Sequence, residues 1–141
     1  MKYPIWPILI VLTANIGYNI ITKQTPPEAN AFASLTVTYL VSALLAGLLF
    51  FCTKEGSIGQ EISKLNYTAP LLAVSVVMLE FGYIFVYRSG WSVNLAPMVA
   101  NILLAVALLW VGKQLYQESI SLRQLGGMAL CVAGLFLMLR R

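Results

Sequence analysis

Five stretches of about 20 mostly apolar residues follow one another along the chain, and they constrain the fold more than any other feature. A helix needs about 20 apolar residues to cross roughly 30 Å of hydrocarbon. In lipid, each stretch must also satisfy its backbone hydrogen bonds internally. We therefore expect an all-α polytopic membrane protein, a five-transmembrane-helix bundle that forms a single transmembrane domain over residues 1–141. The expected spans are 4–22, 31–51, 69–87, 93–116 and 122–139.

The composition agrees with a lipid environment. Apolar residues make up 60% of the 141 residues and charged residues only 10%, whereas soluble domains carry roughly 25% charged residues. A soluble chain of this length could not bury so much apolar surface. The net charge of +4 comes from basic residues that stand singly between apolar runs, apart from the pair Arg140 and Arg141. They form no basic patch, so we expect no nucleic-acid partner.

The residues needed for common hydrolytic and metal chemistry are missing from the sequence. The chain has no histidine, and Cys52 and Cys131 lie far apart without a CxxC spacing. A zinc site, a Cys/His nucleophile and a Ser/His/Asp triad are therefore excluded. We expect no enzyme, and thus no catalytic residue, metal site or cofactor.

Polar residues inside the expected spans recur at helical spacing. They are Asn15, Tyr18, Asn19 and Thr22 in the first span, Ser34, Thr38 and Ser42 in the second, and Asn94 and Asn101 in the fourth. Residues at i, i+3, i+4 and i+7 share one helix face. Polar groups at membrane depth usually face protein or a water-filled cavity. The polar stripes on the first and fourth spans, together with Glu80, Tyr83 and Tyr87 on the third, predict a common polar cavity. Each Asn alone is also typical of helix–helix packing.

The third span contains Glu80, the one acidic residue well inside an apolar run. A carboxylate at that depth is costly unless it is paired, hydrated or protonated. It could exchange protons or bind a cation, and Tyr83 and Tyr87 on the same face could hold an organic cation by cation–π contact. The alternative is a structural carboxylate, bonded to a Tyr or Asn side chain or paired with Arg88.

The last span has a different character. Gly127 and Gly134 lie on a stripe of small residues, which favours close helix packing or a dimer contact. Ser121 and Gln124 have the spacing of a capping box at the start of this span.

Several segments resemble an EamA-type repeat of the drug/metabolite transporter superfamily. The segments are residues 87–92, the run 118–127 and the pair Ala133 and Gly134. The family signature of Glu, a hydrophobic residue, Ser/Thr, Gln and Gly falls on Glu118, Ile120, Ser121, Gln124 and Gly127. Gly17, Tyr18, Asn19 and Lys23 are similar to the Gly/Ser-Asn stretch of the first span in that family. The chain departs from the pattern at Pro97, which comes early in its span, and at Gln117, where the family has Gly.

The resemblance implies a transport fold in which most relatives join two inverted five-helix halves. This chain holds one half. The small multidrug resistance transporters, more distant relatives, work as antiparallel homodimers and carry their membrane carboxylate in the first span. This chain has Asn15 and Asn19 in its first span, so Glu80 would take the role of the membrane carboxylate from the third span.

These observations predict a secondary active transporter or exporter of small organic molecules in the bacterial inner membrane. We expect it to be multi-pass, coupled to H⁺ or another cation, and to work as an antiparallel homodimer in contact with membrane lipid. The expected substrate-binding residues are Glu80, Tyr83, Tyr87, Tyr18, Asn19, Asn15, Asn94 and Asn101. The alternative is a non-transporting or accessory subunit that pairs with another half-size chain, as in lipid-linked sugar translocation.

The Lys and Arg residues divide almost evenly between the two sides of a five-span chain. One side holds Lys2, Lys54, Lys64, Lys113 and Arg123, and the other holds Lys23, Arg88, Arg140 and Arg141. Orientation follows this bias, so a near balance predicts dual topology. A fixed orientation set by the first helix is the alternative.

Overall fold

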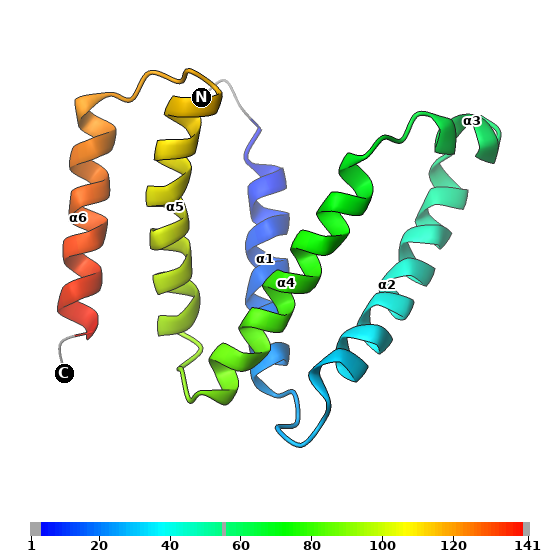
Figure 1. Cartoon of the computed structure of the whole chain (residues 1–141), viewed down its shortest axis with the longest axis horizontal. Coiled ribbons are helices and arrows are strands. Elements are labelled where there is room, and N and C mark those ends of the chain that lie inside the picture. Colours follow the sequence, from blue (N-terminus) through cyan, green and yellow to red (C-terminus); the bar gives the residue numbers. More distant parts are fainter. Residues whose placement is uncertain (1–3, 55, 140–141) are drawn as a thin grey trace. The chain divides into compact units, whose positions relative to one another are not determined.

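The computed structural model describes residues 4–54 and 56–139, and the described part contains helices and no strand (Figure 1). The helices are α1 (Trp6–Lys23), α2 (Ala31–Thr53), α3 (Ile58–Ser63), α4 (Thr68–Arg88), α5 (Leu95–Leu115) and α6 (Leu122–Leu139). The five long helices coincide with the five expected spans to within two residues at each end. The expected loop between the second and third spans additionally contains α3, which begins with a capping box between Ser57 and Gln60.

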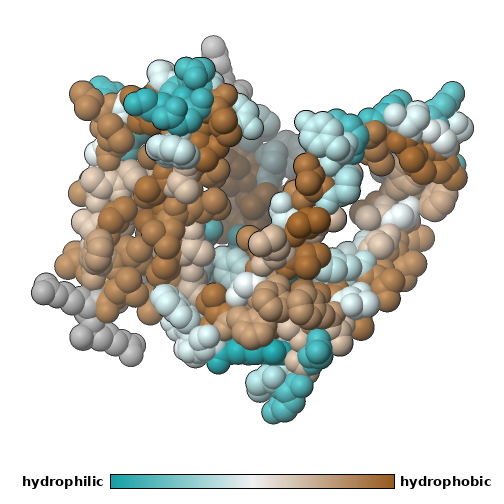
Figure 2. Space-filling view, viewed as in Figure 1, coloured by the Kyte–Doolittle hydropathy of each residue, from teal (hydrophilic) through white to brown (hydrophobic). Residues whose placement is uncertain are grey.

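Within the described residues, four helices, α2, α4, α5 and α6, are long and apolar enough to cross a membrane. In an apolar stretch of 18 residues in each of these helices, no more than 11% of the residues are buried. Their side chains therefore need an apolar solvent. Figure 2 shows this outward surface as brown along the helices, with teal mainly at the loops. The chain is thus a helical, multi-pass membrane protein. The first expected span, α1, is not among the four, because Asn15, Asn19 and Lys23 reduce its hydropathy; a fifth span stays a prediction.

Contacts within the chain gather into two units, Met1–Gly90 and Trp91–Arg141, called here the N-terminal and C-terminal units. The expectation of a single transmembrane domain stays a prediction. In the N-terminal unit, α4 packs against both α1 and α2. Its small core consists of Ala31, Leu35 and Ile84, with Tyr39 and Phe81 packed against them.

The turn between α1 and α2 is fixed by polar contacts at its end. The Asn30 side chain caps α2 by accepting hydrogen bonds from the backbone N–H groups of Phe32 and Ala33, at 2.9 and 3.2 Å. Such a cap satisfies N–H groups that have no partner inside the helix. At the end of α4, Arg88 Nη2 donates to the carbonyl oxygens of Pro26 (3.2 Å) and Ala29 (2.6 Å). The arginine therefore ties α4 to the turn.

The C-terminal unit is a pair of packed helices, α5 and α6. The predicted capping box at α6 is confirmed: Ser121 Oγ accepts from the Gln124 N–H at 3.2 Å, and Gln124 Oε1 accepts from the Ser121 N–H at 2.8 Å. At the end of α5, the N–H groups of Tyr116 and Glu118 both donate to the Gly112 carbonyl. Gly112 is buried, and a Cβ there would lie 2.7 Å from the Glu118 carboxylate. Glu118, Ser121 and Gln124 thus shape the loop between the two helices.

Candidate functional site

The polar stripe of α1 faces α4 at one point. Asn19 is buried, with only 5% of its surface exposed. Its Nδ2 donates to the Asn15 carbonyl at 2.8 Å, and its Oδ1 accepts a hydrogen bond from the Tyr87 hydroxyl at 2.5 Å. The buried Tyr87 hydroxyl and the Asn19 amide therefore join α1 to α4. This is the helix-packing role that the sequence also allowed for each Asn. Asn15 itself is exposed and contributes chiefly through its backbone oxygen and side chain to Asn19.

Three tyrosines link the same two helices. The rings of Tyr18 and Tyr83 meet edge to face with centroids 5.6 Å apart, and those of Tyr83 and Tyr87 lie 6.1 Å apart. Lys23 Nζ lies 5.6 Å from the Tyr87 ring centroid and donates to the Tyr87 carbonyl at 3.5 Å. The cation–π position on Tyr87 is therefore occupied by a side chain of the protein itself.

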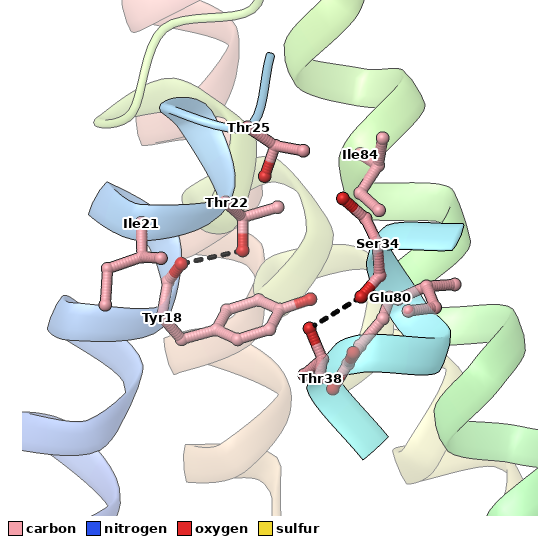
Figure 3. A pocket seen from close by; sticks show the side chains of 9 residues that line it. Tyr18, Ile21, Thr22, Thr25, Ser34, Thr38, Glu80 and Ile84 are labelled. Carbon is pink, nitrogen blue, oxygen red and sulfur yellow. Dashed lines mark hydrogen bonds between the residues drawn. The ribbon is translucent and has the colours of Figure 1, made fainter. Parts of the chain in front are cut away.

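Next to this cluster, the N-terminal unit forms an open-sided cavity of about 190 Å³, called here the Glu80 cavity. Figure 3 shows Tyr18 reaching from α1 toward α2, opposite Ser34 and Thr38, with Glu80 directed toward the same space from α4. The lining residues are Tyr18, Ile21, Thr22, Thr25, Ser34, Leu35, Thr38, Glu80 and Ile84. One carboxylate and a set of hydroxyl groups thus share a half-open, otherwise apolar space.

Glu80 is half-buried, and no Lys or Arg nitrogen of the described residues lies within 4 Å of its carboxylate. Arg88, the partner considered in the sequence, donates to the turn carbonyls instead. The hydroxyls of Tyr18 and Tyr39 are buried and make no hydrogen bond of normal geometry within the described part of the chain. Both are close enough to Glu80 to interact with its charge. The carboxylate therefore has hydroxyl neighbours, and the part of the chain that the structure describes supplies no basic counter-ion within 4 Å of it.

The expected site residues fall into three groups. Tyr18 and Glu80 line the Glu80 cavity, while Asn19, Tyr83 and Tyr87 form the adjoining contact between α1 and α4. Asn15 lies exposed on α1. Asn94, directly before α5, and Asn101, seven residues further along, belong to the C-terminal unit and are exposed there. Their place in a common cavity stays a prediction.

The second span contributes more than the sequence indicated. Ser34 and Thr38 line the cavity, although their four-residue spacing was not assigned to it, and Tyr39 places its hydroxyl near Glu80. The spacing was a usable signal, since it defines one polar face of α2. Tyr39 carried none, because a single Tyr in an apolar helix is typical of packing.

Comparisons of the chain with family models, with curated proteins and with solved structures give no significant match.

Proposed function

We propose that the protein is a secondary active transporter of small organic molecules, with Glu80 as the group that exchanges a proton or binds a cationic substrate. The observation that carries the proposal is the Glu80 carboxylate at the edge of a cavity, without a basic partner among the described residues. A carboxylate inside a membrane helix is expensive and usually functional. A structural carboxylate paired with a cation would be expected to use Arg88, which is engaged elsewhere.

The proposed mechanism is competition for one carboxylate. In the absence of substrate, a proton on a Glu80 oxygen would remove the cost of the buried charge. A cationic substrate entering the cavity would replace that proton, which would leave to the side from which substrate came. Alternating access would then carry either the proton or the substrate across, but not both together.

The proposed assembly is an antiparallel homodimer of five-span chains in the bacterial inner membrane, with α1 as the first span. Its polar face supports this, because Asn19 is turned toward α4 and away from lipid. The Glu80 cavity holds about 190 Å³, less than the roughly 300 Å³ at which ligand pockets usually begin. A second copy would supply the missing wall. The near balance of Lys and Arg residues supports insertion in both orientations, and the EamA-type motifs support the inverted pairing.

The test is transport by purified protein in proteoliposomes under an imposed pH gradient, screened with amines, amino acids and other small metabolites. Glu80→Gln should abolish proton-driven uptake and the accompanying proton movement, because the amide can neither release a proton nor pair with a cation. Glu61→Gln is the matched control. Glu61 is ion-paired with Lys64 on the short helix α3, and its loss should leave transport unchanged.

Helix content measured by circular dichroism separates loss of coupling from loss of folding. If Glu80→Gln folds normally and still drives uptake with the pH gradient, the proposed role of this carboxylate is wrong. If the wild-type chain alone transports none of the compounds, but transports one of them when a second half-size chain is added, the accessory-subunit alternative replaces the proposal.

A further inference from the structure

The hydroxyl groups of the Glu80 cavity are not equivalent, because two of them have already used their proton. Thr22 Oγ1 donates to the Tyr18 carbonyl at 2.7 Å, and Thr38 Oγ1 donates to the Ser34 carbonyl at 3.0 Å. A threonine hydroxyl has one proton and two lone pairs. Both side chains line the cavity (Figure 3), so they offer a ligand acceptor oxygens only.

Thr25 and Ser34 also line the cavity, and two phenol hydroxyls beside the carboxylate add to its acceptor character. The Tyr18 and Tyr39 hydroxyls lie near Glu80 and make no hydrogen bond of normal geometry among the described residues, although the Tyr18 hydroxyl also lies near the Thr22 side chain. Their protons can turn toward the carboxylate. A carboxylate accepts about four hydrogen bonds, so Glu80 keeps capacity for a ligand after both tyrosines have donated. A bound molecule therefore meets oxygens that accept hydrogen bonds on α1, α2 and α4.

Tyr18, Tyr83 and Tyr87 do not form an aromatic cage for a quaternary ammonium group. Such a cage needs free ring faces around the cation. Tyr87 has Lys23 over its ring, and Tyr83 packs against both Tyr18 and Tyr87. Of these three rings, only that of Tyr18 lines the cavity.

We propose that the Glu80 cavity selects primary ammonium groups over quaternary ones. The inference rests on the proposed function, and it specifies the substrate class of that site. A primary ammonium carries three N–H donors, which match the Glu80 carboxylate and the Thr22 and Thr38 oxygens. A trimethylammonium group offers no donor and would cover these oxygens without bonding them. A site built to hydrogen-bond its ligand discriminates strongly against an analogue that lacks the donors.

The experiment compares binding of butylamine and butyltrimethylammonium to the purified full-length chain by isothermal titration calorimetry, near neutral pH. The two probes have the same charge and the same tail. Butylamine should bind at least about tenfold more tightly, as expected from one charged hydrogen bond. Thr38→Val keeps the side-chain shape and should reduce this preference severalfold by lowering butylamine affinity alone.

Thr36→Val is the matched control on the same helix. Thr36 Oγ1 makes the equivalent bond to the Phe32 carbonyl at 2.8 Å, and Thr36 is exposed like Thr38, but it does not line the cavity. Its substitution should leave both affinities unchanged. An equal effect of the two threonine variants, or equal binding of the two probes to wild type, would overturn the substrate-class inference.

Glu80→Gln separates this inference from the function on which it depends. Loss of both probes in this variant supports Glu80 as the cation site, whatever the preference between the probes. If wild type binds neither probe, or Glu80→Gln binds both as well as wild type, the site is not a cation site and the substrate-class inference fails, while proton exchange at Glu80 is decided separately by the transport assay.

Discussion

The two units of the molecule use their polar residues in opposite ways. In the N-terminal unit, polar side chains lie along the helices and meet in the interior, at the Asn19–Tyr87 bond and in the Glu80 cavity. In the C-terminal unit, the polar contacts found are in the loop between α5 and α6, where Ser121 and Gln124 cap α6. Helices that meet through polar side chains can form a binding site. Helices whose polar contacts lie in their connecting loop mainly present apolar surface to their surroundings.

The same contrast applies to residues that look alike in sequence. Asn19 and Asn101 are both amides inside apolar helices, yet Asn19 is buried and bonded while Asn101 is exposed. The difference arises because α4 supplies a tyrosine opposite Asn19. Polar residues in membrane helices thus gain their role from the neighbouring helix, and substitutions should separate the two units clearly.

The largest stability effect is expected at the bond between α1 and α4. Asn19→Leu should lower the free energy of unfolding by about 2 kcal/mol, because it removes the bond and leaves the Tyr87 hydroxyl buried without a partner. Tyr87→Phe should cost about 1 kcal/mol, and the double variant little more than Asn19→Leu alone. The measurement is SDS-induced unfolding in mixed micelles, followed by circular dichroism.

Asn101→Leu is the comparison within the C-terminal unit and should change stability by less than about 0.5 kcal/mol. Comparable losses at Asn19 and Asn101 would break the contrast between the units.

A smaller effect is expected at Arg88. Arg88→Gln should cost about 1 to 1.5 kcal/mol, since the arginine is half-exposed and water replaces part of its bonding to the Pro26 and Ala29 carbonyls. The turn between α1 and α2 should be cleaved faster by added protease. Proton-driven transport should persist, because Arg88 holds the turn and does not neutralise Glu80. Loss of coupling with an intact fold would instead favour an Arg88–Glu80 pair.

Among the contacts that stabilise the fold, the helix caps are expected to contribute least. Ser121→Ala should lower the free energy of unfolding by about 1 kcal/mol, the usual contribution of an N-cap. Ser57→Ala removes the equivalent cap of α3 but should leave global unfolding unchanged, since a six-residue helix can fray alone. Hydrogen exchange of the 58–63 amides would show this local opening. Equal global losses would mean that α3 unfolds together with the long helices.

Much of the fold could be predicted because it depends on local sequence. Length and hydropathy located the long helices, since each must satisfy its own backbone within one segment. The α6 cap was predictable for the same reason, as Ser121 and Gln124 interact across three residues. The helix α3 was missed because its six residues are too few for a hydrophobic periodicity, although its Ser57–Gln60 spacing was visible.

The candidate site was predictable only in outline. Spacing placed Tyr18 and Asn19 on one face of α1 and Glu80 and Tyr83 on one face of α4, because helical geometry fixes such relations within a segment.

Contacts between helices were decided by the tertiary structure. The sequence offered Arg88, Tyr and Asn side chains as equal partners for Glu80, and could not rank them. Packing of α4 against α1 and α2 joined Tyr87 to Asn19, turned Arg88 to the Pro26 and Ala29 carbonyls, and brought Ser34 and Thr38 of α2 beside Glu80. The sequence by itself determined which faces are polar, because a helix repeats every 3.6 residues. Only the packing decided which polar faces meet, because helix crossings depend on the fit of side chains far apart in the chain.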